Sequence, residues 1–266
     1  MIGFRSTVTA EIMSTPPLRL DGKVVLITGS TSGLGRGMAS GLGALGARVA
    51  MSYAHDAERA ERAFAAYREA GGEGILVRGS VIEEEAVDRV VGEVERALGA
   101  VDVLVLNATP PQPLAALERA DWSDYQAMLD YFIKSPYLLA RRVLPAMKAR
   151  GAGRIINIGT ELLARGVRHT SAYATAKAAQ HGWTRAMALE LAPHGITVNT
   201  VSPGWIPVER HASTPPEVLK SYRDGIPMGR LGTPDDVCSA VAYLASDAAG
   251  FVTGQHILVD GGRATG

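Results

Sequence analysis

The chain of 266 residues has little of what marks several classes of protein. Its one cysteine, Cys238, excludes an intramolecular disulfide framework and is expected to be a buried packing residue. Lys plus Arg and Asp plus Glu both total 27, so the net charge of zero offers no general attraction for nucleic acid or an anionic membrane. No segment reaches the roughly 18 consecutive apolar residues of a membrane span. These absences favour a cytoplasmic globular protein.

The N-terminal segment lacks the continuous apolar run of a secretory signal, because it carries Arg5, Glu11 and a pair of prolines. We expect residues 1–20 to be a flexible leader, with Met13 as an alternative start, and residues 21–266 to form a single domain. The histidines and carboxylates show no metal-binding spacing, so we expect no metal site.

Aromatic residues make up 6% of the chain and hydrophobic residues 47%, which predicts a core filled by aliphatic side chains. Short apolar runs alternate with longer Ala-rich stretches of helical period, a rhythm typical of stacked βα units. Because the runs lack polar alternation, we expect a doubly wound, Rossmann-like parallel sheet of seven strands with helices on both faces. The predicted strands are 24–27, 48–51, 75–77, 103–106, 155–158, 196–199 and 257–259. The predicted helices are 34–45, 57–70, 83–98, 122–148 with a kink at Pro136, 172–192 and 235–245.

A glycine-rich turn, Gly29-Ser30-Thr31-Ser32-Gly33-Leu34-Gly35, lies between the first strand and the first helix. Free amides at a helix N-terminus favour an anion, and glycines allow its close approach, so this turn predicts a pyrophosphate site. A literal Gly-x-Gly-x-x-Gly also occurs at 41–46, but it ends the helix and precedes a strand, which is the wrong context. There we expect Gly46 to end the helix and Gly41 to allow close packing.

Tyr173 and Lys177 are four residues apart in a predicted helix, a spacing that places the phenol and the ammonium on one face. A phenol with its ordinary pKa near 10 is a poor acid at neutral pH, unless a neighbouring cation favours its anion. Lys177 can supply that cation. The predicted fifth strand ends just before Thr160, whose hydroxyl would then lie near the same point.

Together these features resemble the short-chain dehydrogenase/reductase family over residues 20–262, and especially its 3-oxoacyl-carrier-protein reductases. The resemblance implies hydride transfer between a nicotinamide dinucleotide and a carbonyl or secondary alcohol. It assigns Tyr173 as general acid/base, Lys177 as its partner, which also holds the nicotinamide ribose, and Thr160 at the family's usual Ser position. The implied dinucleotide-binding residues are Gly29, Ser30, Thr31, Ser32, Gly33, Leu34, Gly35, Ser52, Tyr53, Val81, Asn107, Ala108, Tyr173, Lys177, Pro203, Gly204 and Ile206.

Several positions depart from the family pattern. Phe132 stands where the family often has a catalytic Asn that holds a water for proton relay. Thr109 replaces a glycine of the family motif, and Ser80 replaces an Asp that contacts adenine. Val208 replaces a Thr that contacts the carboxamide. An altered proton path or substrate is the main interpretation, and a cofactor-binding protein without turnover, acting as a sensor or partner subunit, is the alternative.

The end of the second predicted strand bears on the choice of dinucleotide. No carboxylate stands at Ser52 or Tyr53 to hold the ribose diol of NAD, so we favour NADP(H) and keep NAD(H) as possible. Ser32, however, replaces the basic residue often seen before the second motif glycine, which leaves an NAD-dependent alcohol or sugar dehydrogenase open. We expect a small-molecule substrate under a loop at 203–231, a pocket lined by residues such as Trp205, Ile206 and Leu162, and a homodimer or homotetramer, as is common in the family.

Overall fold

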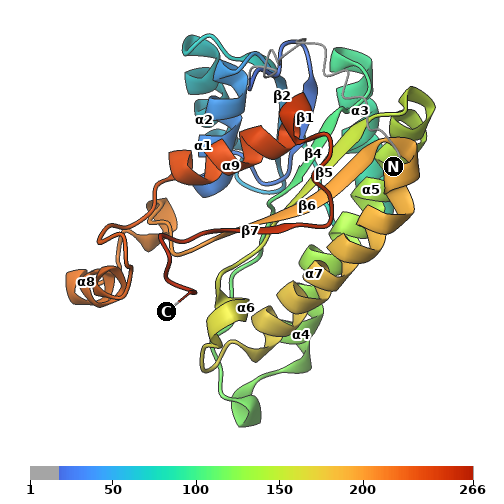
Figure 1. Cartoon of the computed structure of the whole chain (residues 1–266). Coiled ribbons are helices and arrows are strands. Elements are labelled where there is room, and N and C mark those ends of the chain that lie inside the picture. Colours follow the sequence, from blue (N-terminus) through green and yellow to red (C-terminus); the bar gives the residue numbers. More distant parts are fainter. Residues whose placement is uncertain (1–17, 266) are drawn as a thin grey trace, which may run out of the picture.

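A computed structural model of the chain describes residues 18–265 (Figure 1). Most of the predicted leader, with Met13, lies outside these residues. Leu20 is fully buried in the core, and its amide donates to the Leu45 carbonyl oxygen at 2.8 Å. The predicted flexible leader is therefore wrong at Leu20, which packs as part of the fold.

One sheet of seven parallel strands forms the centre of the molecule, as the apolar runs predicted. Its strand order is β3-β2-β1-β4-β5-β6-β7, so the order reverses between β1 and β4. The carboxyl ends of these two strands flank the crevice where doubly wound folds bind their ligands. The strands are β1 (Val24–Ile27), β2 (Arg48–Tyr53), β3 (Glu73–Arg78), β4 (Val103–Leu106), β5 (Gly153–Ile158), β6 (Ile196–Pro203) and β7 (His256–Val259).

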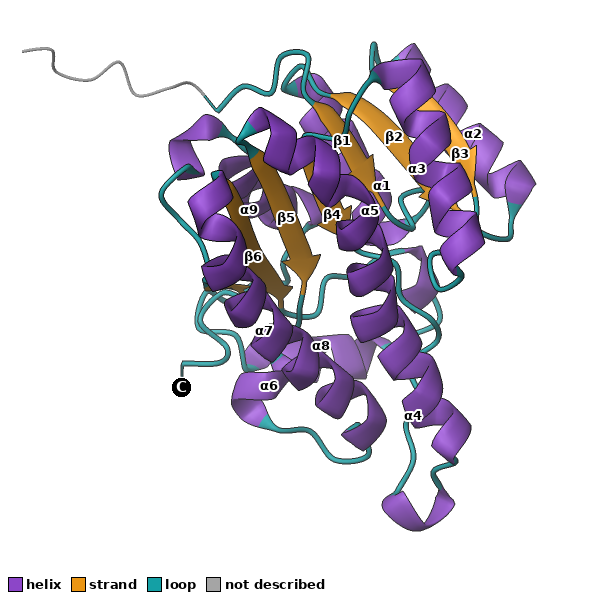
Figure 2. Cartoon of the chain, turned by 90° about the vertical axis from the view of Figure 1, so that its right-hand side faces the viewer, coloured by secondary structure: helices purple, strands orange, loops and turns teal. Residues whose placement is uncertain are grey.

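Helices cover both faces of the sheet (Figures 1 and 2). One core cluster joins the sheet to α1 (Gly33–Ala44), α2 (Ala57–Glu69) and α9 (Pro234–Ala245). The cluster on the other face joins it to α3 (Glu84–Leu98), α5 (Ser135–Arg150) and α7 (Ser171–Leu191). Burial of aliphatic side chains on both faces explains why the strands show no polar alternation.

Glycines in α1 allow this helix to pack closely against α9. A Cβ added at Gly41 would lie 2.4 Å from the Cys238 sulfur, so this position accepts only glycine without rearrangement. Cys238 is buried, as expected, and burial raises the pKa of its thiol to about 11. Gly46 follows the helix with φ of +92°, a conformation that favours glycine. The 41–46 glycines therefore serve helix packing and termination.

The predicted helix 122–148 divides into three parts. These are α4 (Trp122–Leu129), a π-helical segment (Asp130–Lys134) and α5. Pro136 follows the π segment and has no amide proton to donate to the carbonyl of Phe132, four residues earlier, which explains the wider turn. Where a kink was predicted, the helix contains a π segment, and Phe132 lies within it.

The segment between β6 and α9, which we expected to be a loop at 203–231, is partly ordered into helix. Pro203 still belongs to β6, and the segment contains a short 3-10 turn (Glu209–His211) and α8 (Pro216–Asp224). A further short helix, α6 (Leu162–Arg165), follows β5. Figure 1 shows α8 and α6 beyond the carboxyl end of the sheet, where they border the candidate site.

Candidate active site

The glycine turn is held in shape by hydrogen bonds to the two residues that follow β4. The Thr28 hydroxyl oxygen accepts the amides of Asn107 and Ala108, both at 2.9 Å. The Asn107 side-chain amide in turn donates to the carbonyl oxygens of Thr28 and Gly29 at 2.9 and 3.0 Å. Asn107 and Ala108 thus connect the turn to the end of β4, where the strand order reverses. These two predicted binding residues therefore hold the turn in shape.

Ser30 and Ser52 are engaged inside the protein. The Ser30 hydroxyl donates to the Ile27 carbonyl at 2.8 Å and accepts the Ser52 amide at 2.9 Å. The Ser52 hydroxyl oxygen accepts the Gly29 amide at 3.3 Å, and both serines are buried. Thr31 is buried as well. We expected Ser30 and Thr31 to bind the dinucleotide, whereas the Ser30 hydroxyl instead ties the turn after β1 to the end of β2.

The backbone of the turn requires its glycines. A Cβ at Gly35 would lie 2.4 Å from the Gly29 carbonyl oxygen and 2.7 Å from the Asn107 side-chain nitrogen, so only glycine fits. Gly29 and Gly33 have φ values of +63° and +54°. Leu34 packs against the core on the helix side. These residues leave the first amides of α1 facing the crevice, where they would hold a pyrophosphate.

The remaining predicted dinucleotide residues lie around the same crevice. Val81 is buried after β3, beside Ser80, and Tyr53 is partly exposed at the end of β2. Gly204 donates its amide to the Val259 carbonyl oxygen at 2.9 Å, which continues the pairing of Pro203 with β7. Ile206 is buried against the core. The residues come from β2, β3 and β6, so the topology brings distant parts of the chain to one edge.

Tyr173 lies at the start of α7 and is 6% exposed. Burial raises the pKa of its phenol, although hydrogen bonding to Thr160, the charge of Arg210 and hydrogen bonding to Gln112 each lower it. Thr160, also buried, accepts the Leu162 amide on its hydroxyl oxygen at 3.2 Å. The structure therefore brings together the phenol and the hydroxyl that the sequence separates by thirteen residues.

Lys177 is 5% exposed and sits one turn further along α7. Its ammonium donates to the Ile158 carbonyl oxygen at 2.6 Å and to the Gln180 side-chain oxygen at 3.2 Å. Burial lowers the pKa of Lys177 well below its ordinary value. This differs from the expectation that Lys177 lowers the pKa of Tyr173, because burial dominates both groups and the ammonium faces Ile158.

Phe132 covers Lys177. Its ring centroid lies 3.6 Å from the lysine nitrogen, and the ring meets that of Tyr173 edge to face at a centroid distance of 5.6 Å. The attraction between a cation and an aromatic face contributes about 0.5 to 2 kcal/mol. The π segment thus presents an aromatic ring, at the position of the expected Asn, to both key side chains of α7.

The segment after β6 is connected to the residue beside Thr160. The Tyr222 hydroxyl of α8 donates to the Glu161 carboxylate at 3.0 Å and accepts the Trp205 amide at 2.6 Å. Glu161 is buried and pairs with Arg165 at 3.2 Å. These contacts hold α8 close to the carboxyl end of β5.

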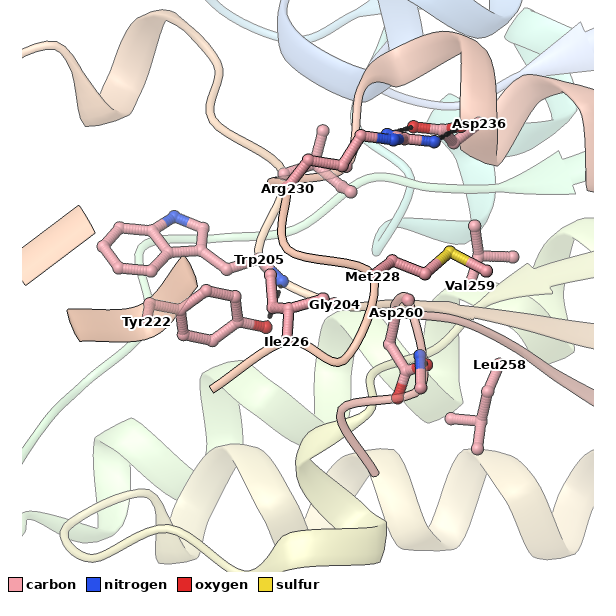
Figure 3. Close-up of a pocket in the computed structure, with 14 residues that line it drawn as sticks. Gly204, Trp205, Tyr222, Ile226, Met228, Arg230, Asp236, Leu258, Val259 and Asp260 are labelled. Carbon is pink, nitrogen blue, oxygen red and sulfur yellow. Dashed lines mark hydrogen bonds and ion pairs between the residues drawn. The ribbon is translucent and has the colours of Figure 1, made fainter. Parts of the chain in front are cut away.

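A cavity of about 360 Å³ lies between this segment and β7 (Figure 3). Trp205, Ile206 and Tyr222 line it, as do Leu258 and Met228. Of the residues predicted to line the substrate pocket, Trp205 and Ile206 line this cavity, whereas Leu162 does not, and neither do Tyr173 and Thr160.

Sequence reasoning missed several polar partners. Gln180 follows Lys177 by three residues on α7, so helical spacing could have identified it. Gln112, which lowers the pKa of Tyr173, lies in a segment without regular structure, and Glu209, whose carboxylate accepts the Gly33 amide, begins a short 3-10 turn. Their partners are distant in the chain, and no local spacing indicates such contacts.

Comparisons with known proteins agree with this architecture. A family model described as enoyl-(acyl carrier protein) reductase matches residues 29–264. The 3-oxoacyl-[acyl-carrier-protein] reductase of Haemophilus influenzae is 34% identical over 245 residues, which cover 91% of this chain and 98% of the relative. The cis-4-hydroxycyclohexanecarboxylate dehydrogenase of Sinomonas cyclohexanicum is 35% identical over 240 residues, with 90% and 96% covered.

Among solved structures, one from Beutenbergia cavernae superposes with a TM-score of 0.85 at 33% identity and covers 94% of this chain and 100% of its own. It is provisionally assigned as an NAD(P)-dependent gluconate 5-dehydrogenase and contains NADP at low occupancy. The chain belongs to the short-chain dehydrogenase/reductase family and is an enzyme of that family, an NAD(P)-dependent oxidoreductase.

Within residues 18–265, no helix is both long and apolar enough to cross a membrane. In the same range, no group of three or more His, Cys, Asp or Glu side chains is arranged to hold a metal ion.

Proposed function

We propose that this enzyme transfers a hydride between NADP(H) and a ketone or secondary alcohol, with Tyr173 as general acid/base. The observation that carries the proposal is that Tyr173, Thr160 and Lys177 come together at the carboxyl end of β5, in a sheet whose β1 ends in a glycine turn. These groups come from the end of β5 and from α7, at the edge where doubly wound sheets bind ligands.

In the reductive direction, Tyr173 gives its proton to the substrate oxygen, and Thr160 donates a hydrogen bond to the same oxygen. The bound dinucleotide supplies the hydride to the carbonyl carbon. Burial of the phenol, which raises its pKa, keeps Tyr173 protonated and ready to act as an acid. In the oxidative direction, Tyr173 must first be an anion, a form that the charge of Arg210 favours.

Lys177 holds the nicotinamide ribose hydroxyls in this proposal. The Phe132 ring and the Ile158 carbonyl fix the ammonium in place. Since Phe132 has no group to hold a relay water, the proton of Tyr173 exchanges along another path.

The preference for NADP(H) rests on the end of β2. Ser52 is buried and hydrogen-bonded within the turn, which leaves Tyr53 as the partly exposed side chain near the ribose. No carboxylate there repels a 2′-phosphate. The NADP found in the related Beutenbergia cavernae structure supports the same choice. NAD(H) is the second candidate, because Ser32 lacks the positive charge that would bind a 2′-phosphate.

For the substrate we propose a small molecule with a ketone or secondary hydroxyl group, held under the segment 203–231 of a single domain. The names of the relatives, a 3-oxoacyl reductase and a hydroxycyclohexanecarboxylate dehydrogenase, support this functional group. We also propose a homodimer or homotetramer that works in the cytoplasm.

A panel of ketones and secondary alcohols, followed at the nicotinamide absorbance with both dinucleotides, tests the proposal. Turnover with NADP(H) and weaker turnover with NAD(H) is expected. A ligand at a hundred times its dissociation constant stabilises a protein by about 2.7 kcal/mol, so thermal unfolding with each dinucleotide measures preference independently of the substrate. If neither dinucleotide raises the unfolding midpoint, the proposed function is wrong. Binding without turnover on any substrate favours the sensor or partner subunit instead.

A further inference from the structure

The segment after β6 returns to the glycine turn. Gly33, the second glycine of the turn, lies against Val208, and a Cβ added at Gly33 would be 3.4 Å from a Val208 methyl group. Glu209 follows Val208 and begins the 3-10 turn that ends at His211. Within the described part of the chain, the side chain of Ser32, the N-cap of α1, makes no capping hydrogen bond. The cap of this helix therefore comes from elsewhere.

Glu209 supplies it. The Gly33 amide donates to one carboxylate oxygen of Glu209 at 3.0 Å, and the guanidinium of Arg36 forms an ion pair with the other oxygen. Glu209 and Arg36 are 176 and three residues away from Gly33 in the chain. Both charged side chains are about half exposed, at 51% and 53%. One carboxylate thus bridges a helix N-terminal amide and a guanidinium, as an oxyanion of a phosphate would.

The surroundings of Glu209 favour an anion. Burial raises the pKa of its carboxyl group, but hydrogen bonding from its own amide, the charge of Arg36, the Gly33 amide and the charge of Arg59 outweigh burial and lower it. Arg210, the next residue, points its guanidinium Nε to the His211 ring at 3.1 Å. Glu209 therefore carries its charge at neutral pH, directly at the turn that would receive a pyrophosphate.

We propose that the Glu209 carboxylate is an internal substitute for the dinucleotide pyrophosphate, that Arg36 is a ligand of that pyrophosphate, and that binding displaces Glu209 and moves residues 206–211. This inference rests on the proposed function for the identity of the ligand. Two anions cannot share the Gly33 amide and the Arg36 guanidinium, since like charges at this distance repel. Release of Glu209 therefore links dinucleotide binding to the segment that borders the substrate site.

The geometry selects the pyrophosphate over the 2′-phosphate of NADP. Glu209 meets Gly33, whose amide lies at the first turn of α1, whereas a 2′-phosphate extends from the adenine ribose toward the end of β2 near Tyr53. NADP and NAD share the pyrophosphate. Changes at Glu209 and Arg36 must therefore alter the binding of both dinucleotides by the same factor.

Calorimetric titration of the full chain with NADP, NAD and inorganic pyrophosphate tests the proposal. Glu209→Gln keeps the size of the side chain but removes the competing charge. We expect it to lower the dissociation constants of NADP, NAD and pyrophosphate by about threefold to fivefold, which corresponds to the free energy of an exposed ion pair. Arg36→Met should weaken all three by about fivefold. In the double variant, Glu209→Gln should lower the dissociation constants less, because Arg36 is absent and cannot move from Glu209 to the pyrophosphate.

Glu217→Gln is the matched control, since Glu217 lies in the same segment, at the first turn of α8, and is exposed. It should leave all three dissociation constants unchanged. Unchanged or weaker binding by Glu209→Gln would overturn the inference, as would an effect confined to NADP. If the wild-type chain binds pyrophosphate but neither dinucleotide, the proposed function fails, while the effect of Glu209→Gln on pyrophosphate still decides the inference.

Displacement of the segment has its own readout. The Val208 amide donates to the His211 ring at 3.1 Å, and hydrogen exchange at residues 206–211 reports on this turn. Pyrophosphate alone should speed exchange there in the wild-type chain, because it releases Glu209. Exchange that stays constant at saturating pyrophosphate would contradict the displacement.

Discussion

The two halves of the site are built by different means. The glycine turn is made of backbone groups and small hydroxyls, tied by hydrogen bonds across β1, β2 and β4. The half around Tyr173 is made of large buried side chains, in which the Phe132 ring contacts both the phenol and the Lys177 ammonium. In the first half, close contacts exclude side chains larger than glycine at positions such as Gly35. In the second half, burial shifts the pKa values of Tyr173 and Lys177.

The largest expected effect tests the second half. Tyr173→Phe removes only the phenol oxygen, so we expect turnover to fall about a thousandfold, within the range of lost acid/base catalysis, while dinucleotide binding stays intact. Steady-state kinetics and calorimetry measure the two properties. Tyr125→Phe is the control, because Tyr125 donates to Ser171 at 2.8 Å near the same cluster and has no proposed role in proton transfer. Similar turnover in the two variants would remove Tyr173 from its assigned role.

The next prediction tests the first half. Gly35→Ala places a methyl group 2.4 Å from the Gly29 carbonyl oxygen, and we expect a loss of about 2 to 3 kcal/mol of stability together with loss of dinucleotide binding. Gly182→Ala, in α7 with no heavy atom within 4 Å of the added Cβ, should instead stabilise by about 0.5 to 1 kcal/mol. Thermal unfolding with and without dinucleotide measures both. Equal behaviour of the two variants would contradict the tight fit of the turn.

A smaller effect is expected at the end of β2. Tyr53→Asp introduces a carboxylate that accepts the ribose hydroxyls of NAD and repels a 2′-phosphate. We expect the ratio of kcat/KM for NADP over NAD to fall about tenfold, which corresponds to about 1.4 kcal/mol. Tyr53→Asn, without the charge, should change the ratio less. An unchanged ratio in Tyr53→Asp would place the selection of the dinucleotide elsewhere.

The smallest effect concerns Phe132. Phe132→Leu keeps an apolar side chain but removes the ring that stabilises the Lys177 cation, so the pKa of Lys177, already lowered by burial, should fall further. Activity that requires the cation is lost as pH rises through this pKa. The alkaline limb of the pH profile should therefore move to lower pH by about half a unit, equivalent to about 0.7 kcal/mol.

If the alkaline limb of the Phe132→Leu profile stays at the wild-type pH, the ring does not stabilise the Lys177 cation. Phe132→Asn separates two explanations of the altered residue. A large gain in turnover in Phe132→Asn would mean that the site is a damaged version of the family pattern, whereas little gain supports a different proton path.

The same contrast explains what the sequence could predict. The seven strands and the glycine turn follow from local patterns, because apolar runs and glycine spacing are short-range signals. The reach of β6 to Pro203, the burial of Leu20 and the helix α8 depend on contacts between distant segments. In the site, Asn107 was found from a motif, but Glu209 meets Gly33 across 176 residues and carries no local signal.

The π segment has a consequence for chain length. It accommodates one extra residue in a helical turn, and each residue of an α-helix turns the chain by about 100°. Deleting one residue from 130–134 would let this turn return to α-helix with little rotation of α4 relative to α5, and a different side chain of the segment would then face Lys177. Insertions and deletions in this helix, as much as substitutions, therefore decide which side chain stands above Lys177.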